Sequence, residues 1–124
     1  DQAMYKVLLV EDEDAVRSFA ARALRNKGYT VIEAASGEQA LALPAEQLER
    51  VELLISDVVM PNLDGPSLAA ELRLRRPNLR VLFISGYAED SLRTSLAKSP
   101  HVNFLPKPFS LSQLAGKVKE VMGP

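Results

Sequence analysis

The chain has 124 residues, of which 25% are charged and 47% hydrophobic, a composition ordinary for one globular domain that buries a core without disulfides. A formal net charge of -1 argues against bulk electrostatic binding of nucleic acid or an anionic membrane, and the lack of cysteine excludes thiolate chemistry. No stretch approaches the roughly 20 apolar residues of a membrane span and no signal peptide is evident, so we expect a cytoplasmic segment without membrane contact.

Apolar runs alternate with helical periodicity along the chain, which is the pattern of repeated strand–helix units. The first predicted strand is Lys6–Val10. We expect Asp14 to be the N-cap of a helix from Ala15 to about Lys27, and Gly28 to follow its C-cap. Apolar residues in this helix repeat every three and four positions, so one of its faces is expected to pack on the sheet.

The rest of the chain continues the alternation and adds capping signals at the helix starts. The further predicted elements are, in chain order, a strand at Tyr29–Ala34, a helix opened by the capping box Ser36–Gln39 and broken by Pro44, a strand at Val51–Ser56, a helix capped by Asp64 that runs to about Arg76, a strand at Arg80–Ile84, a weak helix within Ala88–Lys98, a strand at Val102–Leu105, and a helix capped by Ser110 that runs to Val121. Five such units with right-handed crossovers predict an α/β fold with helices on both faces of a parallel sheet.

Polar side chains follow four of the predicted strands at the point where each strand ends. They are Glu11 and Asp12 after the first strand, Asp57 after the third, Ser85 after the fourth and Lys107 after the fifth. In an open parallel sheet these ends meet in one crevice, where ligands usually bind. Three carboxylates, a hydroxyl and an ammonium at that edge indicate a site for Mg²⁺ and a phosphoryl group. Without a cation, repulsion between the carboxylates should raise at least one of their pKa values.

With these motifs in this order, the chain resembles the receiver domains of two-component response regulators from about Lys6 to Met122. The residues that carry the resemblance are the acidic pair Glu11-Asp12, Ser56-Asp57 with Met60-Pro61 and Asp64-Gly65, Ser85-Gly86, and Lys107-Pro108-Phe109. The resemblance implies a flavodoxin-like (βα)5 three-layer sandwich with a five-stranded parallel sheet of order 2-1-3-4-5. Residues 10–14 and 104–109 are most similar to receivers attached to hybrid histidine kinases. Residues 85–90 are similar to those of the cell-cycle hybrid kinases of alphaproteobacteria.

The resemblance implies a role for each residue at the strand ends. The roles are Asp57 as the phosphoacceptor and a metal ligand, Asp12 as a direct Mg²⁺ ligand, Glu11 as a ligand through water, the main-chain carbonyl of Val59 as a further ligand, Lys107 as the cation facing the phosphoryl group, Ser85 as a hydroxyl donor to a phosphoryl oxygen, and Phe104 as the aromatic partner of Ser85 in a conformational switch. The resemblance also implies a cis Lys107–Pro108 peptide bond. Taken singly, these residues are explained as well by helix caps, solvated acids, a surface lysine and a core phenylalanine, and only their combination favours a site.

Four positions depart from the commonest form of the family or adjust its chemistry. Glu11 stands where the family more often has aspartate, and Ser85 where threonine is equally familiar. Tyr87 and Val59 lie where the family adjusts the access of hydrolytic water. Because the Val59 side chain cannot hydrogen-bond water, we expect the acyl phosphate to hydrolyse at a slow to moderate rate.

Other charged residues are interpreted without a functional role. We expect Glu13 and Asp14 to be solvated apart from the cap, and His101 to be a solvated loop residue. The arginines Arg73, Arg75, Arg76 and Arg80 are expected to form a solvated helix end and the start of the following strand.

Several functions remain open at this stage. The leading interpretation is one receiver domain over residues 1–124, with its core at about 6–122, that takes phosphate from a histidine kinase or exchanges it with a histidine phosphotransfer protein. It could be excised from a larger hybrid kinase, whose parent chain could be membrane-anchored, or act as a diffusible regulator. A receiver-like scaffold that takes no phosphate is the alternative from another class. A phosphatase with an Asp57 nucleophile is disfavoured because Val58 and Val59, and no second acid, follow it.

Overall fold

The computed structural model describes residues 5–85 and 102–123, and its elements follow the predicted alternation. In chain order they are β1 (Lys6–Val10), α1 (Asp14–Asn26), β2 (Thr30–Ala34), α2 (Gly37–Leu41), α3 (Ala45–Leu48), β3 (Leu53–Asp57), α4 (Gly65–Arg75), β4 (Arg80–Ser85), β5 (Val102–Pro106) and α6 (Leu111–Met122). The predicted helix within Ala88–Lys98, together with Gly86, Tyr87 and His101, lies outside the described residues.

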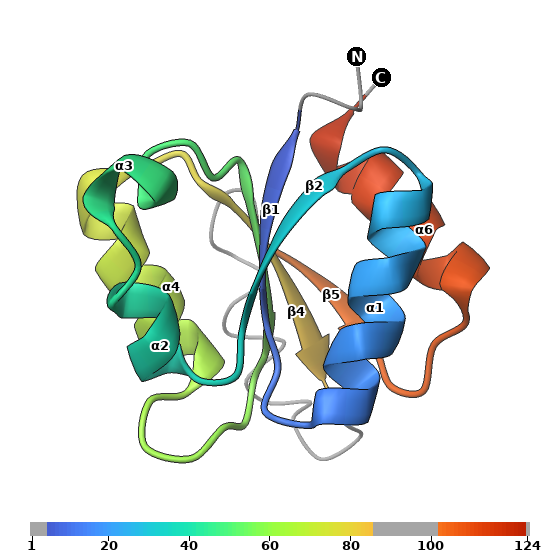
Figure 1. Ribbon diagram of the computed structural model, residues 1–124, viewed down its shortest axis with the longest axis horizontal. Coiled ribbons are helices and arrows are strands. Elements are labelled where there is room, and N and C mark those ends of the chain that lie inside the picture. The colour runs from blue at the N-terminus through green and yellow to red at the C-terminus, as the bar shows by residue number, and fades with distance from the viewer. Residues whose placement is uncertain (1–4, 86–101, 124) are drawn as a thin grey trace.

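The five strands form one parallel sheet of order β2-β1-β3-β4-β5, which confirms the predicted flavodoxin-like arrangement. Figure 1 shows α1 and α6 covering one face of the sheet and α2, α3 and α4 covering the other, so the fold has three layers. The C-terminal ends of the strands, marked by the arrowhead of β4, point to the lower side of that view. The predicted site residues therefore belong to this edge.

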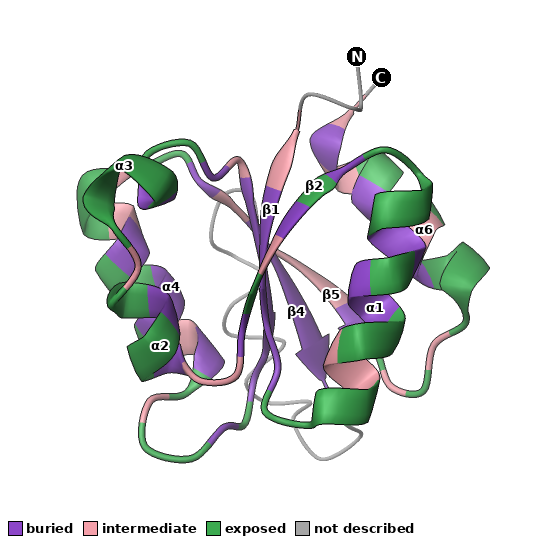
Figure 2. Cartoon of the chain, in the orientation of Figure 1, coloured by how far each residue is buried: buried purple, intermediate pink, exposed green. Residues whose placement is uncertain are grey.

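Successive side chains of a strand point to opposite faces of the sheet, so they belong to two separate hydrophobic cores. Val7, Leu9 and Ile55 point to the core under α1 and α6, whereas Leu8 and Leu54 point to the core under α2, α3 and α4. The three central strands β1, β3 and β4 are buried along nearly their whole length, whereas the edge strands β2 and β5 also carry exposed or half-buried residues. Figure 2 shows the same contrast between β4 and β5, and helices that alternate buried and exposed faces. Burial on both faces is why the central strands read as continuous apolar runs.

Two of the predicted helix starts have the capping geometry expected from the sequence. The Asp64 carboxylate accepts a hydrogen bond from the Ser67 N–H at 2.7 Å and begins α4. Ser110 and Gln113 form a complete capping box at the start of α6, at 3.0 and 2.8 Å. At α2 only half of the box forms, because the Gln39 side chain accepts from the Ala35 N–H and not from the N-cap residue.

The predicted Asp14 cap of α1 is wrong. Asp14 is the first residue of the helix, and the N-cap is Glu13, whose side chain makes no capping hydrogen bond. The Asp14 carboxylate instead accepts from the Arg17 guanidinium at 2.6 Å, one turn further along the helix. An acid in the first turn is still favourable, because the helix dipole is positive there.

The solvated arginine cluster was also predicted incorrectly in part. Arg73 donates two hydrogen bonds to the Leu79 carbonyl, at 3.1 and 2.6 Å. Arg76 donates to the carbonyls of Glu49, at 2.8 Å, and of Val51. These two side chains therefore tie the end of α4 to neighbouring backbone, which a run of arginines in the sequence does not reveal. None of the helices in the described part of the chain has the length and apolar character that a membrane crossing requires.

Candidate functional site

Three carboxylates gather at the C-terminal edge of the sheet. Glu11 and Asp12 directly follow β1, and Asp57 is the last residue of the neighbouring β3. One oxygen from each lies within 4.8 Å of the other two. Hard carboxylate oxygens at such separations are the donors that Mg²⁺ prefers, so these residues fit a magnesium ion.

The three acids differ sharply in their exposure to solvent. Glu11 is 0% exposed and Asp57 is 7% exposed, whereas Asp12 is exposed. A buried carboxylate without a counter-ion is costly, so Glu11 and Asp57 need a cation close by. The acidic edge, formed by Glu11, Asp12 and Asp57, is therefore exposed to solvent at Asp12 and buried at Glu11 and Asp57.

The Lys107 ammonium is the cation that reaches both buried acids. Its Nζ lies 2.9 Å from Asp57 Oδ2, to which it donates a hydrogen bond, and 2.9 Å from Glu11 Oε1. Oε1 of Glu11 is an ion-pair partner only, since among the described residues it accepts no hydrogen bond. The exposed Glu13 carboxylate lies further away, at 3.8 Å from Nζ. Lys107 thus joins the ends of β1, β3 and β5.

The pKa values of two groups in the site, Glu11 and Lys107, are raised. Burial raises the pKa of Glu11, and repulsion from Asp57 adds to the rise, while Lys107 and the Glu13 N–H offset it in part. The predicted rise is confirmed for Glu11, with burial as a larger cause than repulsion. Burial alone would lower the pKa of Lys107, but Asp57 and Glu11 outweigh it and raise that pKa above its ordinary value. The ammonium therefore stays charged at neutral pH.

The backbone fixes the strand ends against one another. The Lys107 N–H donates to the Ser85 carbonyl at 2.9 Å, and the Val58 N–H donates to the Ile84 carbonyl at 3.1 Å. The Lys107–Pro108 peptide bond is cis, as the resemblance implied. The loop after β3 returns to the same place, because the Gly65 N–H donates to the Val58 carbonyl at 2.9 Å.

Ser85, Phe104 and Val59 occupy distinct environments. Ser85 ends β4, is fully buried, and its hydroxyl has no hydrogen-bond partner among the described residues. Phe104 is half-buried and contacts Phe83 with ring centroids 5.7 Å apart. Val59 lies in the loop after β3 with 63% of its surface exposed. A buried hydroxyl without a partner is unusual, so within the described part of the chain the Ser85 hydroxyl has hydrogen-bonding capacity to spare.

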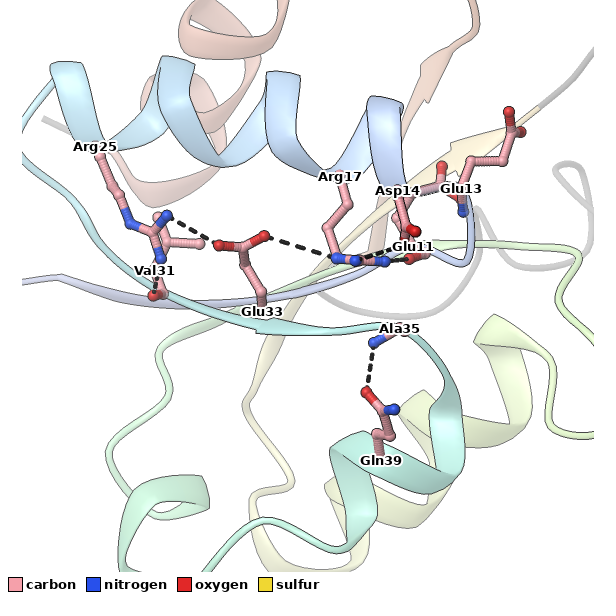
Figure 3. Close-up of polar contacts among 9 residues, drawn as sticks. All are labelled: Glu11, Glu13, Asp14, Arg17, Arg25, Val31, Glu33, Ala35 and Gln39. Carbon is pink, nitrogen blue, oxygen red and sulfur yellow. Dashed lines mark hydrogen bonds and ion pairs between the residues drawn. The ribbon is translucent and has the colours of Figure 1, made fainter.

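Two features of the site were missed in the sequence. Arg17 donates from Nη1 to the Glu11 carbonyl at 2.7 Å, so a residue of α1 supports the acidic loop (Figure 3). Gly65 lies so close to the end of β3 that an added Cβ would be 2.3 Å from the Asp57 carbonyl oxygen. The only signals were an arginine five residues after Asp12 and a glycine in the motif Asp64-Gly65, and neither shows its contact.

Comparisons with known proteins agree on one family. The sequence profile described as the response regulator receiver domain matches residues 7–119. The chain is 54% identical over 116 residues to the sensor kinase CckA of Brucella abortus, covering 94% of this chain but 12% of that protein. It is 34% identical to the response regulator receiver protein CpdR of the same organism, covering 96% of this chain and 98% of that one.

A solved structure gives the same result. The crystal structure of the receiver domain from the hybrid histidine kinase CckA has a TM-score of 0.79 and 44% identity, and the match covers 95% of this chain and 99% of that one. The fold is therefore shared with receiver domains.

Proposed function

The chain belongs to the family of response regulator receiver domains of two-component systems, and on this premise we propose that it accepts a phosphoryl group on Asp57. The observation that carries the proposal is the pairing of Asp57 with Lys107. The Asp57 carboxylate ends a buried strand and meets an ammonium at 2.9 Å. Phosphoryl transfer asks a protein mainly for a positioned nucleophile and for positive charge near the transferred oxygens.

The reaction is an in-line displacement at phosphorus. An Asp57 carboxylate oxygen attacks the phosphorus of a phosphohistidine, forming a P–O bond as the P–N bond breaks and the imidazole leaves with the electron pair. Lys107 offers its three N–H donors to Asp57 and to the arriving phosphoryl oxygens. The unpartnered Ser85 hydroxyl is positioned at the neighbouring strand end to donate to another of those oxygens.

Mg²⁺ is the proposed cofactor, held by Asp12 and Asp57, by Glu11 through water and by the main-chain carbonyl of Val59. This assignment is supported by the three carboxylates, each of which places an oxygen within 4.8 Å of the other two. When bound, the ion neutralises charge on the phosphoryl oxygens. The chain itself supplies the positions of the carboxylates, because Glu11 and Asp57 are buried and each contacts Lys107.

The transferred group is proposed to act through the switch pair Ser85 and Phe104. Phe104 lies one strand over from the core residue Phe83, and Ser85 is two residues beyond Phe83 on β4. Movement of the Ser85 hydroxyl toward a phosphoryl oxygen would leave space beside it for the Phe104 ring. The partner in this scheme is a histidine kinase domain or a histidine phosphotransfer protein.

Two relatives support two settings for this chemistry. The 54% identity with the sensor kinase CckA supports a receiver that is part of a hybrid kinase, and the chain spans 12% of that protein. The 34% identity with CpdR, matched over 98% of its length, supports a stand-alone regulator. The higher identity favours the hybrid kinase. A scaffold that takes no phosphate is disfavoured, because Asp57, Asp12 and Lys107 are all present.

Intact-mass spectrometry after incubation with acetyl phosphate tests the proposal, with and without Mg²⁺. We expect one added phosphoryl group on the wild-type chain with Mg²⁺ and none on Asp57→Asn, which keeps the size of the side chain and removes the nucleophile. An adduct that persists in Asp57→Asn would reject Asp57 as the acceptor. If the wild type took no phosphate either from acetyl phosphate or from a phosphorylated histidine phosphotransfer protein, the scaffold would replace the receiver.

A further inference from the structure

We propose that Arg17 is a positioning residue for the acidic edge, which it holds by fixing the peptide unit that joins Glu11 to Asp12. This inference rests on the proposed Mg²⁺-dependent function and adds a residue that touches neither the metal nor the phosphoryl group. It assigns a functional role to a side chain of α1 that the sequence motifs leave out.

The Arg17 guanidinium contacts three different parts of the fold. Nη1 donates to the Glu11 carbonyl at 2.7 Å and Nη2 donates to Asp14 Oδ1 at 2.6 Å. Nε lies 3.6 Å from Glu33 Oε1 on β2. The Arg17 side chain is only 16% exposed, and Figure 3 shows its guanidinium between Glu33 and the Glu11–Asp14 loop.

Glu33 is itself held in place by a second arginine of the same helix. Arg25 Nη1 donates to Glu33 Oε2 at 2.9 Å, and Arg25 Nη2 donates to the Val31 carbonyl at 2.9 Å. The carboxylate of Glu33 therefore lies between two guanidinium groups (Figure 3). Arg17 reaches Glu11 from an anchored position and not from a free surface rotamer.

The peptide unit that Arg17 contacts sets the position of Asp12. A peptide is planar, so fixing the Glu11 carbonyl also fixes the amide of Asp12. The Glu11 N–H is held on its other side by the Ala34 carbonyl at 3.1 Å. Among the described residues, none donates a hydrogen bond to the side chain of the exposed Asp12, so within that part of the chain the backbone is the support that holds this carboxylate.

A purely electrostatic role and a positioning role for Arg17 predict opposite changes in Mg²⁺ affinity when its side chain is removed. If the guanidinium acted only as a nearby positive charge, its loss would strengthen the attraction of the acidic edge for Mg²⁺. If it positions the Glu11–Asp12 peptide, its loss weakens Mg²⁺ binding, since outer partners of metal ligands typically contribute tenfold or more in affinity. The sign of the change therefore separates the two roles.

Titration calorimetry of Mg²⁺ into the 124-residue chain is the direct test. We expect Arg17→Ala to raise the Kd for Mg²⁺ by about tenfold. Arg25→Ala is the matched control, because it removes the same charge from the same helix and the same Glu33 partner without touching Glu11. Its Kd should rise much less than that of Arg17→Ala, because Arg25 supports Arg17 only indirectly through Glu33 and the hydrogen bond from Arg17 to Glu11 remains. Amide hydrogen exchange at Asp12 in metal-free protein should be faster in Arg17→Ala than in Arg25→Ala.

Arg17→Lys is a second, more conservative variant, which keeps the test informative if Arg17→Ala fails to fold. It keeps the charge but not the planar fork that reaches several acceptors at once, so Mg²⁺ binding should weaken by about threefold or more. Unchanged or tighter binding in Arg17→Ala, an equal loss in Arg25→Ala, or wild-type affinity in Arg17→Lys would overturn the inference. A wild-type chain that bound no Mg²⁺ would overturn the proposed function as well, so the two failures are distinguishable.

Discussion

Replacing Gly65 with alanine tests the closest approach between the acceptor strand and the helix behind it. Gly65 is the first residue of α4, and its Cα lies against the end of β3. A Cβ added there would lie 2.3 Å from the Asp57 carbonyl oxygen and 3.1 Å from the Ser56 hydroxyl, which itself donates to that carbonyl at 2.9 Å. The obstacle is backbone of a buried strand and cannot rotate away.

Two opposing contributions set the size of the effect. Alanine in a helix is favoured over glycine by about 0.5–1 kcal/mol, because glycine loses more backbone freedom. The contact would be about 1 Å shorter than the roughly 3.3 Å at which carbon and oxygen meet in weak C–H···O contacts. Overpacking of this kind costs about 1–3 kcal/mol. We therefore expect Gly65→Ala to lower the free energy of unfolding by about 1–2 kcal/mol.

Gly116→Ala in α6 is the matched control, because a Cβ at that position meets nothing within 4 Å. It should raise the free energy of unfolding by about 0.5–1 kcal/mol. Urea unfolding followed by far-ultraviolet circular dichroism gives both values in one assay. If Gly65→Ala proved as stable as Gly116→Ala, the close approach of α4 to Asp57 would be refuted.

Three further predictions follow from contacts of the described residues. Lys107→Ala should still bind Mg²⁺ in calorimetry but should no longer be phosphorylated by acetyl phosphate, because the change removes the ammonium 2.9 Å from Asp57. Phosphorylation of this variant at the wild-type rate would contradict the role of Lys107. Arg76→Ala should lower the free energy of unfolding, measured in urea, by about 1–3 kcal/mol, because the carbonyls of Glu49 and Val51 lose a charged donor. The control Arg75→Ala, at an exposed neighbouring position, should change that free energy little. Equal effects of the two substitutions would reject the contact of Arg76 with these carbonyls. Burial, and then the nearby Tyr5, raises the pKa of Tyr29 above its ordinary 10.0, so the folded protein keeps this proton where the unfolded chain loses it. The free energy of unfolding should therefore fall as pH rises above 10.0, and Tyr29→Phe should flatten that slope in urea titrations at pH 9 to about 11.

The strands and the strand-end residues were predictable because both depend on local patterns. Apolar runs buried on two faces mark strands, and short polar residues at fixed offsets mark helix starts, as Asp64 and Ser110 do. In a parallel sheet all strands end at one edge, so the gathering of Glu11, Asp57 and Lys107 follows from topology once the order of strands is known.

The contacts that set the geometry of the site were not predictable from the sequence. Asp14 is a residue type that commonly caps helices, but its carboxylate accepts a hydrogen bond from Arg17 and does not cap α1. Which of these two contacts forms depends on tertiary packing, which the sequence does not show. The burial of Glu11 beside an exposed Asp12 depends on the turn after β1, although both are acids in adjacent positions. The close approach of Gly65 depends on how α4 packs, which a single glycine does not encode.

The proposed function requires Asp57 to be the residue that carries the phosphoryl group. Borohydride reduces an aspartyl phosphate to homoserine, so treatment of the acetyl phosphate-labelled protein followed by peptide sequencing in a mass spectrometer locates the modified residue. We predict homoserine at position 57, dependent on Mg²⁺, with Asp12 and Glu11 unmodified. Homoserine at another acidic position, with Asp57 intact, would contradict it.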